Sequence, residues 1–525
     1  MPSRGVPCRQ CAEREETPHG GGPPDPVRRG SDTESRANGE PESITVPATV
    51  VASRRMVRAR RHQPTEFAPW LANARDQLDE LGPTVTRLYL IGDRPDRSAE
   101  GVRRWAHGEP LPAGWDHHPR GHHTSGHSPV FRFVRADGPA VEIHRAAAWF
   151  GDRHELDPAT AAEAWDRLGR MIGRAFDEGQ LFATPATTGR YLWSRTIPPG
   201  HSWPVLDPEL QELIRSTSGQ GRIELRPLPA DTIPRFVEYD GRMMYGALCW
   251  GLAGGNVTHD TGDTYEGQTR GRYRVTFQVP RDWTHVGILG APAETGGWHY
   301  PSRPGQRAQS WVDGAELGIA IAQGWRVKIH ERILFDGYRG TGPLDRWAKT
   351  LIRLRERAAE LVEHGRMAPA VGELVAAGIR SIIVQGIGAF QGRQRTVTRS
   401  SSSIAEVPAG AVGRHVVDGD HVWTETIESG LPSMNHPEWS TAIWARARAR
   451  LLICPTGQRH APAGALALDP ATILAFRTDA LYLTEDPRWP DDGAAGRLRH
   501  TQTIEGPHAT PRDVWDLLAL QQGER

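Results

Sequence analysis

Lysine is nearly absent from this sequence. Of its 63 Lys and Arg residues, only Lys328 and Lys349 are lysines, and 63 acidic residues balance the basic ones. This balance excludes binding to nucleic acid through a global excess of positive charge, so any such surface must be a local patch. The cations of a phosphate-binding site are then expected to be arginines, whose planar guanidinium group can bind two oxygens at once.

Cysteine is also scarce, and long apolar runs are missing. Four cysteines in 525 residues exclude a disulfide scaffold and favour a reducing compartment. No apolar run is long enough to cross a bilayer and no signal peptide opens the chain, so we expect a cytoplasmic protein without a membrane partner. The length leaves room for two or three domains with sizeable cores.

An aspartate stands at the end of an expected strand in the middle of the chain. Phe236, Val237 and Tyr239 have strand character, and Asp240 follows where that strand should stop. Gly241 then frees the backbone to turn, and the apolar spacing of the next residues favours a short helix. A carboxylate at the end of a strand is well placed to hold a metal ion.

A second carboxylate is presented in the same way towards the C-terminus. The apolar run Ile473–Phe476 is interrupted at Arg477–Ala480 and resumes at Leu481–Leu483, which predicts a hairpin with Asp479 at its tip. Two carboxylates, together with the phosphates of a substrate, are a ligand set that Mg²⁺ accepts. Asp240 and Asp479 are therefore candidate ligands of a two-metal site for phosphoryl transfer.

Three short motifs occur in order along the chain: Asp240-Gly-Arg-Met-Met-Tyr245-Gly, Arg380-Ser-Ile-Ile-Val384-Gln-Gly-Ile387-Gly388, and Arg477-Thr478-Asp479-Ala480. Their order and spacing resemble the motifs of the family B DNA polymerases, in particular the protein-primed branch of phages and linear replicons. The family has Asp-x-x-Ser-Leu-Tyr-Pro, Lys-x-x-x-Asn-Ser-x-Tyr-Gly and Asp-Thr-Asp-Ser at these places. The resemblance covers roughly Asp157 to Gly506.

The resemblance implies roles for individual residues. Asp240 and Asp479 would be the catalytic residues and would bind two Mg²⁺ ions, with Mn²⁺ as an alternative. Tyr245 would lie under the incoming sugar and exclude a 2′-hydroxyl group. Arg380 would pair with the triphosphate, where the departing pyrophosphate needs its charge neutralised. The other implied nucleotide contacts are Gly241, whose carbonyl would also face the metal ions, Thr478 and Gly388.

A glycine turn ahead of Asp240 carries the implied contact with the template strand. The protein-primed branch has Tyr-x-Gly-Gly at this distance, and Ser218-Gly219-Gln220-Gly221 resembles it without the tyrosine. An ordinary glycine turn that ends a helix explains the same residues equally well. The template-binding candidates are Ser218, Gly219 and Gly221.

The implied fold is α+β: an antiparallel polymerase-type palm and helical fingers, preceded by a degenerate RNase H-like exonuclease domain. Apolar spacings of three and four independently predict two helices, over 343–364 and about 370–390, which would be the antiparallel fingers. The expected parts are a disordered tail (1–63), the exonuclease-like domain (64–182), a template-contact segment with the first part of the palm (183–280), an insertion subdomain that grips the priming protein (281–342), the fingers (343–392), the second part of the palm (393–506) and a C-terminal tail (507–525).

Two clusters of potential metal ligands also have a plain structural explanation. Cys8-Arg-Gln-Cys11 has the spacing of a zinc knuckle, but no second ligand pair completes the site, and free thiols in a tail are favoured. The loop 105–129 holds six histidines without regular spacing, so a solvated loop is favoured over a metal site.

Several departures from the family pattern bear on activity. The acids of a proofreading nuclease are missing from the exonuclease-like region. Gly246 replaces a proline, Val384 and Ile387 replace polar and aromatic residues of the finger helix, and Arg477 replaces the first aspartate of the hairpin, where it could repel metal ions or contact a phosphate. About twenty-five residues follow Arg499, too few for a thumb domain.

We therefore expect a DNA-directed DNA polymerase without proofreading, of the kind encoded by mobile elements. Its partners would be primer-template DNA, deoxynucleoside triphosphates and a terminal or priming protein. The departures leave open a polymerase-derived protein that has lost catalysis and serves as a DNA-binding or replication-accessory protein. An unrelated α/β protein with chance motif matches is the third interpretation.

Overall fold

The computed structural model describes the chain in segments: 48–52, 57–60, 68–69, 71–72, 87–91, 111–117, 131–135, 141–151, 156–219, 221–267, 270–294, 297–336, 341–392, 394–408, 412–417, 420–428, 432–458 and 461–521. The Cys8 and Cys11 pair and most of the histidine-rich loop lie outside these segments. The fold is α+β, as expected, and most of its strands pair in antiparallel fashion.

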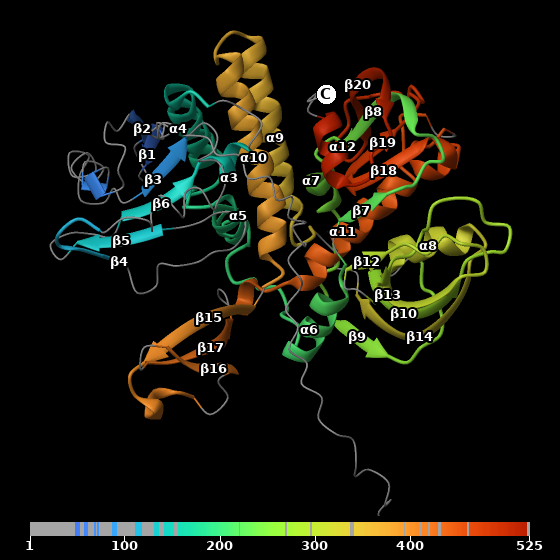
Figure 1. The fold of residues 1–525 in the computed structure, drawn as a ribbon, viewed down its shortest axis with the longest axis horizontal. Helices are drawn as coiled ribbons and strands as arrows, with labels where there is room; N and C mark the ends of the chain where they lie inside the picture. Colours follow the sequence, from blue (N-terminus) through green and yellow to red (C-terminus); the bar gives the residue numbers. More distant parts are fainter. Residues whose placement is uncertain are drawn as a thin grey trace, which may run out of the picture.

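A five-stranded antiparallel sheet carries both candidate carboxylates (Figure 1). Successive residues of a strand face opposite sides of a sheet. Val237 and Tyr239 accordingly pack into the main core, whereas Phe236 packs on the other side under helix α12 (Val514–Gln521). The strands lie in the order β20 (Leu498–Ala509), β8 (Thr232–Gly241), β19 (Ala480–Leu483), β18 (Ile473–Thr478) and β7 (Arg222–Leu225).

A second antiparallel sheet lies beside the first (Figure 1). Buried Arg222 joins the two, because its guanidinium donates to the Gly287 carbonyl at 2.9 Å and lies between the rings of Tyr300 and Phe476. The strands lie in the order β13 (Arg307–Asp313), β10 (Arg270–Gln278), β14 (Arg326–Phe335) and β9 (Val257–Asp260), and β13 leads into helix α8 (Gly314–Ala322). A small ribbon of β11 (Ala291–Pro292) and β12 (Trp298–His299) adjoins them.

Two long helices stand between this part and the N-terminal part of the molecule (Figure 1). They are α9 (Asp345–Glu363) and α10 (Pro369–Ala389), and they confirm the predicted antiparallel helix pair. The expectation that no apolar run is long enough to cross a bilayer is wrong for α10, which is long and apolar enough by length and composition; 56% of its apolar window is buried within the protein. The other helices are α3 (Ala147–Phe150), α4 (Pro158–Ala175), α5 (Pro185–Ser194), α6 (Pro208–Thr217), α7 (Met244–Leu248) and α11 (Pro437–Leu452).

A six-stranded sheet forms the N-terminal part. Strands β1 and β2 lie within 1–63, where we expected disorder. β1, with β-branched Val50 and Val51, pairs with β3, and β2 pairs with β1. Within the described residues, no group of three or more His, Cys, Asp or Glu side chains is arranged to hold a metal ion. The order is β2 (Val57–Arg60), β1 (Ala48–Ala52), β3 (Arg87–Ile91), β6 (Val141–Arg145), β5 (Phe131–Arg135) and β4 (Trp115–His117), with only β3 and β6 parallel.

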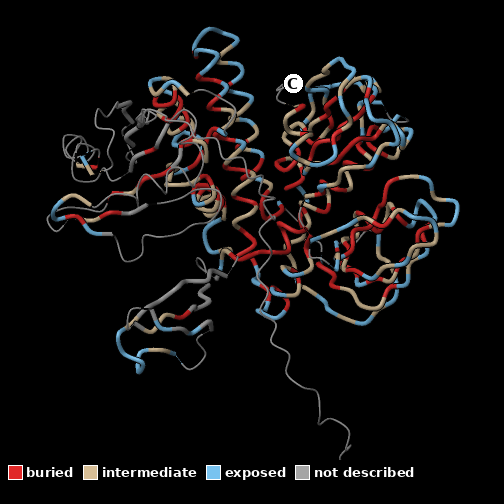
Figure 2. Tube along the Cα trace, viewed as in Figure 1, coloured by how far each residue is buried: buried red, intermediate tan, exposed pale blue. Residues whose placement is uncertain are grey.

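A small three-stranded sheet projects from the connection between α10 and α11 (Figure 1). Buried positions gather where α10, α11 and the two antiparallel sheets approach one another, while the outer loops are exposed (Figure 2). The candidate carboxylates thus sit on a sheet anchored in the largest core. The small sheet has the order β15 (Gln394–Ser401), β17 (Asp420–Glu428) and β16 (Val412–Val417), and the short 3₁₀ turns are Ile404–Glu406, Pro432–Met434, Ala465–Ala467 and Pro470–Thr472.

The crossing of α5 and α10 depends on two facing glycines and gives a test of the fold. We expect Gly189→Ala to destabilise the protein, because a Cβ there would lie 2.7 Å from the Ile382 carbonyl oxygen and 2.9 Å from the Gly386 Cα. Overpacking of this kind costs about 1–3 kcal/mol. Gly388→Ala is the matched control, since a Cβ at that helical glycine meets nothing within 4 Å. Thermal unfolding should show a lower midpoint for Gly189→Ala alone; equal midpoints for both variants would contradict the close crossing.

Candidate active site

The two candidate carboxylates lie on neighbouring antiparallel strands. Asp240 is the penultimate residue of β8 and stands opposite Ala480 in the register with β19. The Gly241 amide donates a hydrogen bond to the Asp479 carbonyl at 3.0 Å. The hairpin predicted from the sequence is present, with Asp479 at its tip between β18 and β19. Strand pairing therefore fixes the backbone of one aspartate against that of the other.

The turn at the tip of the hairpin has an unfavourable backbone conformation. Thr478 has a φ of 58°, a left-handed conformation that a β-branched residue rarely adopts and that costs on the order of 1–3 kcal/mol. Its hydroxyl donates to the Arg477 carbonyl at 2.7 Å and lies 3.1 Å from Asp479 Oδ1. Gly221 packs against this turn, since a Cβ there would come within 3.1 Å of the Thr478 Cα. Surrounding contacts thus hold Asp479 in a strained turn.

The Asp479 carboxyl is buried, with 4% of its surface exposed. Burial and then the nearby charge of Asp240 raise its pKa to about 7, although Arg380 and the hydroxyl of Thr478 oppose the rise. Two carboxylates that repel each other in a buried setting favour either a shared proton or a cation between them. The pair has the chemistry of a site for divalent cations.

Tyr245 and Arg380 approach this pair from two helices. Tyr245 lies in α7, is largely buried, and has its pKa raised first by burial and then by the charge of Asp479, while Arg380 lowers it. Gly241 is needed for α7 to begin here, because a Cβ at this position would come within 2.6 Å of the Met244 Cβ. A strand end, a hairpin tip, a short helix and a long helix therefore converge on one point.

Further arginines surround Asp240. Burial lowers the pKa of Arg355 in α9, and Arg499, Arg380 and Arg242 lower it further, whereas Asp240 raises it. Arg499 faces Asp240 across the register of β20. We did not single out Arg355 from the sequence, although it stands at the edge of the apolar stripe of its helix, where a cation is unexpected. An arginine at the edge of an apolar helix face is therefore the sequence feature that could have identified Arg355.

The template candidates form the turn after α6. Ser218 caps this helix and its hydroxyl donates to backbone carbonyls. Gly219 has a φ of 61°, which favours glycine, and a Cβ there would lie within about 3.5 Å of Trp298 and Arg448. Backbone conformation thus favours glycine at 219, and the close approach of Thr478 favours it at 221, beside the hairpin that bears Asp479.

Two further residues of the predicted face of α10 lie beyond Arg380 along the helix. Ile387 is completely buried in the main core, so the face of α10 that we expected to hold both triphosphate and base pair is closed at that position. Gly388 lies in the last turn of α10, eight residues and about 12 Å along the axis from Arg380. Helical periodicity identified the shared face but not whether the core covers it.

Arg477 points away from the expected phosphate contact. Its guanidinium donates to Gln521 Oε1 of α12 at 3.3 Å, and Gln521 Nε2 donates to Glu238 Oε1 at 2.8 Å. The residue that replaces the first aspartate of the hairpin therefore attaches a helix to the sheet.

No protein-family model matches the chain, and no curated protein matches its sequence. Among solved structures it is similar to Phi29 DNA polymerase in complex with primer-template DNA and incoming nucleotide substrates, with a TM-score of 0.49 and 13% identity over 72% of this chain and 68% of that chain. An orthorhombic crystal form of Phi29 DNA polymerase gives 0.48 and 12% over 72% and 68%. Its post-translocation complex with primer-template DNA gives 0.47 and 12% over 73% and 68%.

The raised pKa of Asp479 gives a test that needs no substrate. Because the pKa is about 7 in the folded protein against an ordinary value of 3.8 for an aspartate, the folded state holds this proton more tightly. Its stabilising effect is complete below about pH 4 and is lost as the pH rises through 7, by at most about 4 kcal/mol. In chelator, Asp479→Asn should flatten the decline of the unfolding midpoint between pH 5 and pH 8.

Two comparisons sharpen that test. Mg²⁺ should raise the midpoint of the wild type at pH 8 and leave that of Asp479→Asn unchanged. Asp491→Asn is the control, because the pKa of Asp491 is shifted in the opposite direction: a hydrogen bond from the Gly493 amide lowers it. Parallel pH profiles for wild type and Asp479→Asn would contradict the raised pKa of Asp479.

Proposed function

We propose that this protein is a DNA-directed DNA polymerase that adds nucleotides to a primer by two-metal chemistry and lacks proofreading. The observation that carries the proposal is the convergence of Asp240, Asp479, Tyr245 and Arg380 on one point. Four separate elements supply them, so the grouping is a property of the tertiary structure. The same residues carry the motif resemblance in the sequence.

Asp240 and Asp479 fit divalent cations. Mg²⁺ usually takes one or two protein carboxylates and completes its shell with water and substrate phosphates. Burial and then the negative charge of Asp240 raise the pKa of Asp479, and a bound cation would relieve the repulsion between the two carboxylates. When bound, the ions would activate the primer hydroxyl and stabilise charge on the transferred phosphoryl group. We propose Mg²⁺ as the ion, with Mn²⁺ as an alternative.

The arginines around Asp240 would bind the triphosphate. Arg380 and Arg355 come from the two long helices, so they can neutralise the β- and γ-phosphates of a nucleotide whose α-phosphate faces Asp240. Arg499 and Arg242 lie on the other side, in the palm sheet and just after β8, where the primer end would reach the site. Gly241, Thr478 and Gly388 remain proposed nucleotide contacts.

The ring of Tyr245 would shape the sugar site. It is largely buried beside Asp479, so its position is fixed and a 2′-hydroxyl group would meet the ring. The turn of Ser218, Gly219 and Gly221 would guide the template strand, since it packs directly against the catalytic hairpin. Primer-template DNA, deoxynucleoside triphosphates and a terminal or priming protein are the proposed partners, the last one on the insertion at 281–342.

Loss of one carboxylate separates catalysis from DNA binding. Asp479→Ala should abolish Mg²⁺-dependent primer extension and leave DNA affinity nearly unchanged, because affinity rests on arginine contacts with phosphates. Glu485→Ala is the control, since Glu485 is an exposed carboxylate just beyond β19. Extension is measured with a labelled primer, and binding by fluorescence anisotropy. A wild type that binds DNA and never extends a DNA or protein primer would favour the accessory protein instead.

The role of the helix arginines is tested by nucleotide affinity. Arg380→Ala and Arg355→Ala should each raise the KM for the nucleotide roughly tenfold or more, because each loses a charge-assisted contact with the triphosphate. Arg353→Ala is the matched control, an exposed arginine on the same helix as Arg355. Steady-state incorporation of single nucleotides measures the effect. Equal KM values for Arg353→Ala and Arg355→Ala would exclude Arg355 from the site.

A further inference from the structure

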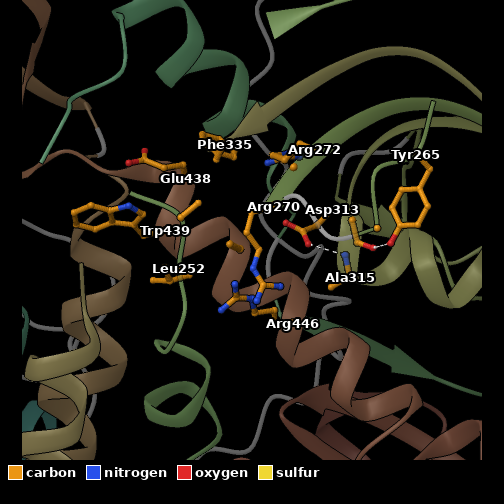
Figure 3. Close-up of a pocket in the computed structure, with 15 residues that line it drawn as sticks. Leu252, Tyr265, Arg270, Arg272, Asp313, Ala315, Phe335, Glu438, Trp439 and Arg446 are labelled. Atoms are coloured by element: carbon orange, nitrogen blue, oxygen red, sulfur yellow. Dashed lines mark hydrogen bonds between the residues drawn. The ribbon is translucent and has the colours of Figure 1, made fainter. Parts of the chain in front are cut away.

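Two adjoining cavities lie outside the candidate active site, between α11 and the β10 sheet. The inner one, of about 150 Å³, is lined by β10, the start of α8 and α11 (Figure 3). The outer one, of about 490 Å³, extends from it over the exit of α7. Both are lined by Arg270, Ala315 and Arg446, so the two arginines stand where the cavities meet. None of the four converging active-site residues lines either cavity.

The inner cavity has an excess of fixed cations. Arg446 donates to the carbonyls of Leu248, Trp250 and Gly251 at 2.9 to 3.0 Å. Arg272 donates to the carbonyls of Ile214 and Thr217 at 3.3 and 2.6 Å. Both guanidinium groups are thus held in place by backbone oxygens, so they would lose little side-chain freedom on binding a ligand.

These cations outnumber the carboxylates around them. Asp313 and Glu438 also line the inner cavity, and the charge of Asp313 interacts with Arg272 and Arg446. Within the described residues, no carboxylate forms an ion pair with Arg270, Arg272 or Arg446. Burial and then the neighbouring charge of Arg270 lower the pKa of Arg446 to about 10. The Nε of Arg272 is buried and has no hydrogen-bond partner, although this side chain is only 3% exposed. A small anion would satisfy this donor and reduce the repulsion between the arginines.

The outer cavity offers an aromatic surface beside the same cations. The side chain of Trp250 is 52% exposed, and the bond from Arg446 to its carbonyl holds its backbone at the rim. Arg450 adds a further cation, and Leu248, Ile319 and Ile453 give an apolar floor. An exposed indole next to arginines is the usual platform on which an unpaired nucleobase stacks.

We propose that these two cavities form a nucleotide-binding site separate from the active site, in which Arg270, Arg272 and Arg446 hold a phosphate group and Trp250 stacks on the base. The inner volume admits a phosphate group, and the outer volume is within the usual range for small-molecule sites. The ligand is a phosphate-linked nucleotide, either free or within single-stranded DNA. Binding at this site needs no catalysis, so it can be tested independently of the proposed polymerase activity.

Binding to single-stranded DNA in chelator tests the site on the full-length protein. Fluorescence anisotropy is measured with a labelled oligodeoxythymidylate over a range of salt concentrations. Trp250→Ala should raise the Kd roughly fivefold or more, as for a lost base stack. Arg270→Ala should reduce the slope of log K against log salt by about 0.7, as for one phosphate contact with a single strand. Both side chains are exposed, so both variants should fold.

Arg274→Ala is the matched control. Arg274 is on the same strand as Arg270, but it pairs with Glu331 at 2.9 Å and lines neither cavity, so its loss should change neither Kd nor slope. Thymidine monophosphate that displaces the oligonucleotide identifies a free nucleotide as the ligand, and displacement by oligonucleotides alone identifies the strand. Trp250→Ala and Arg270→Ala that bind like Arg274→Ala would overturn the proposal, as would a wild type that binds neither ligand.

Discussion

The antiparallel pairing of β8 with β19 is the constraint on which the candidate site depends. One hydrogen bond, from the Gly241 amide to the Asp479 carbonyl, closes the ladder at the point where both strands turn away. A shift of register by one residue would send Asp240 to the opposite face of the sheet. Apolar residues on both faces of β8 oppose such a shift, since Phe236 packs under α12 and Tyr239 in the main core.

Arginine side chains supply the positive charges that join separate elements of this fold. Arg448 and Glu316 form a buried two-point ion pair at 2.7 and 2.8 Å, and Arg222 is enclosed between two aromatic rings. Arg448 thereby joins α11 to α8, and Arg222 joins β7 to the segment that holds Gly287 and Tyr300. Arginines also gather around Asp240 and around the inner and outer cavities beside α11, so a chain without net charge has local cationic surfaces. Such surfaces are what a phosphate-binding protein needs.

Local features of the fold could be predicted from the sequence because their causes are local. The interrupted apolar run specified the hairpin of Asp479, and Asp157 and Asp207, each followed by proline, cap the helices they precede. Other features depend on contacts between distant segments. The burial of Ile387 follows from the core against which α10 packs, and the place of Arg355 follows from how α9 stands beside the sheet. Periodicity defines a helical face without saying what covers it.

The position of manganese in a crystal tests the central claim most directly. The protein would be soaked with Mn²⁺ and a non-hydrolysable deoxynucleoside triphosphate, and the ions located by anomalous scattering. Two metals that share Asp240 and Asp479 should give peaks roughly 3.5–4 Å apart between these carboxylates, with the triphosphate directed towards Arg380. Manganese bound elsewhere, with no peak between Asp240 and Asp479 at saturating concentration, would contradict a two-metal polymerase site.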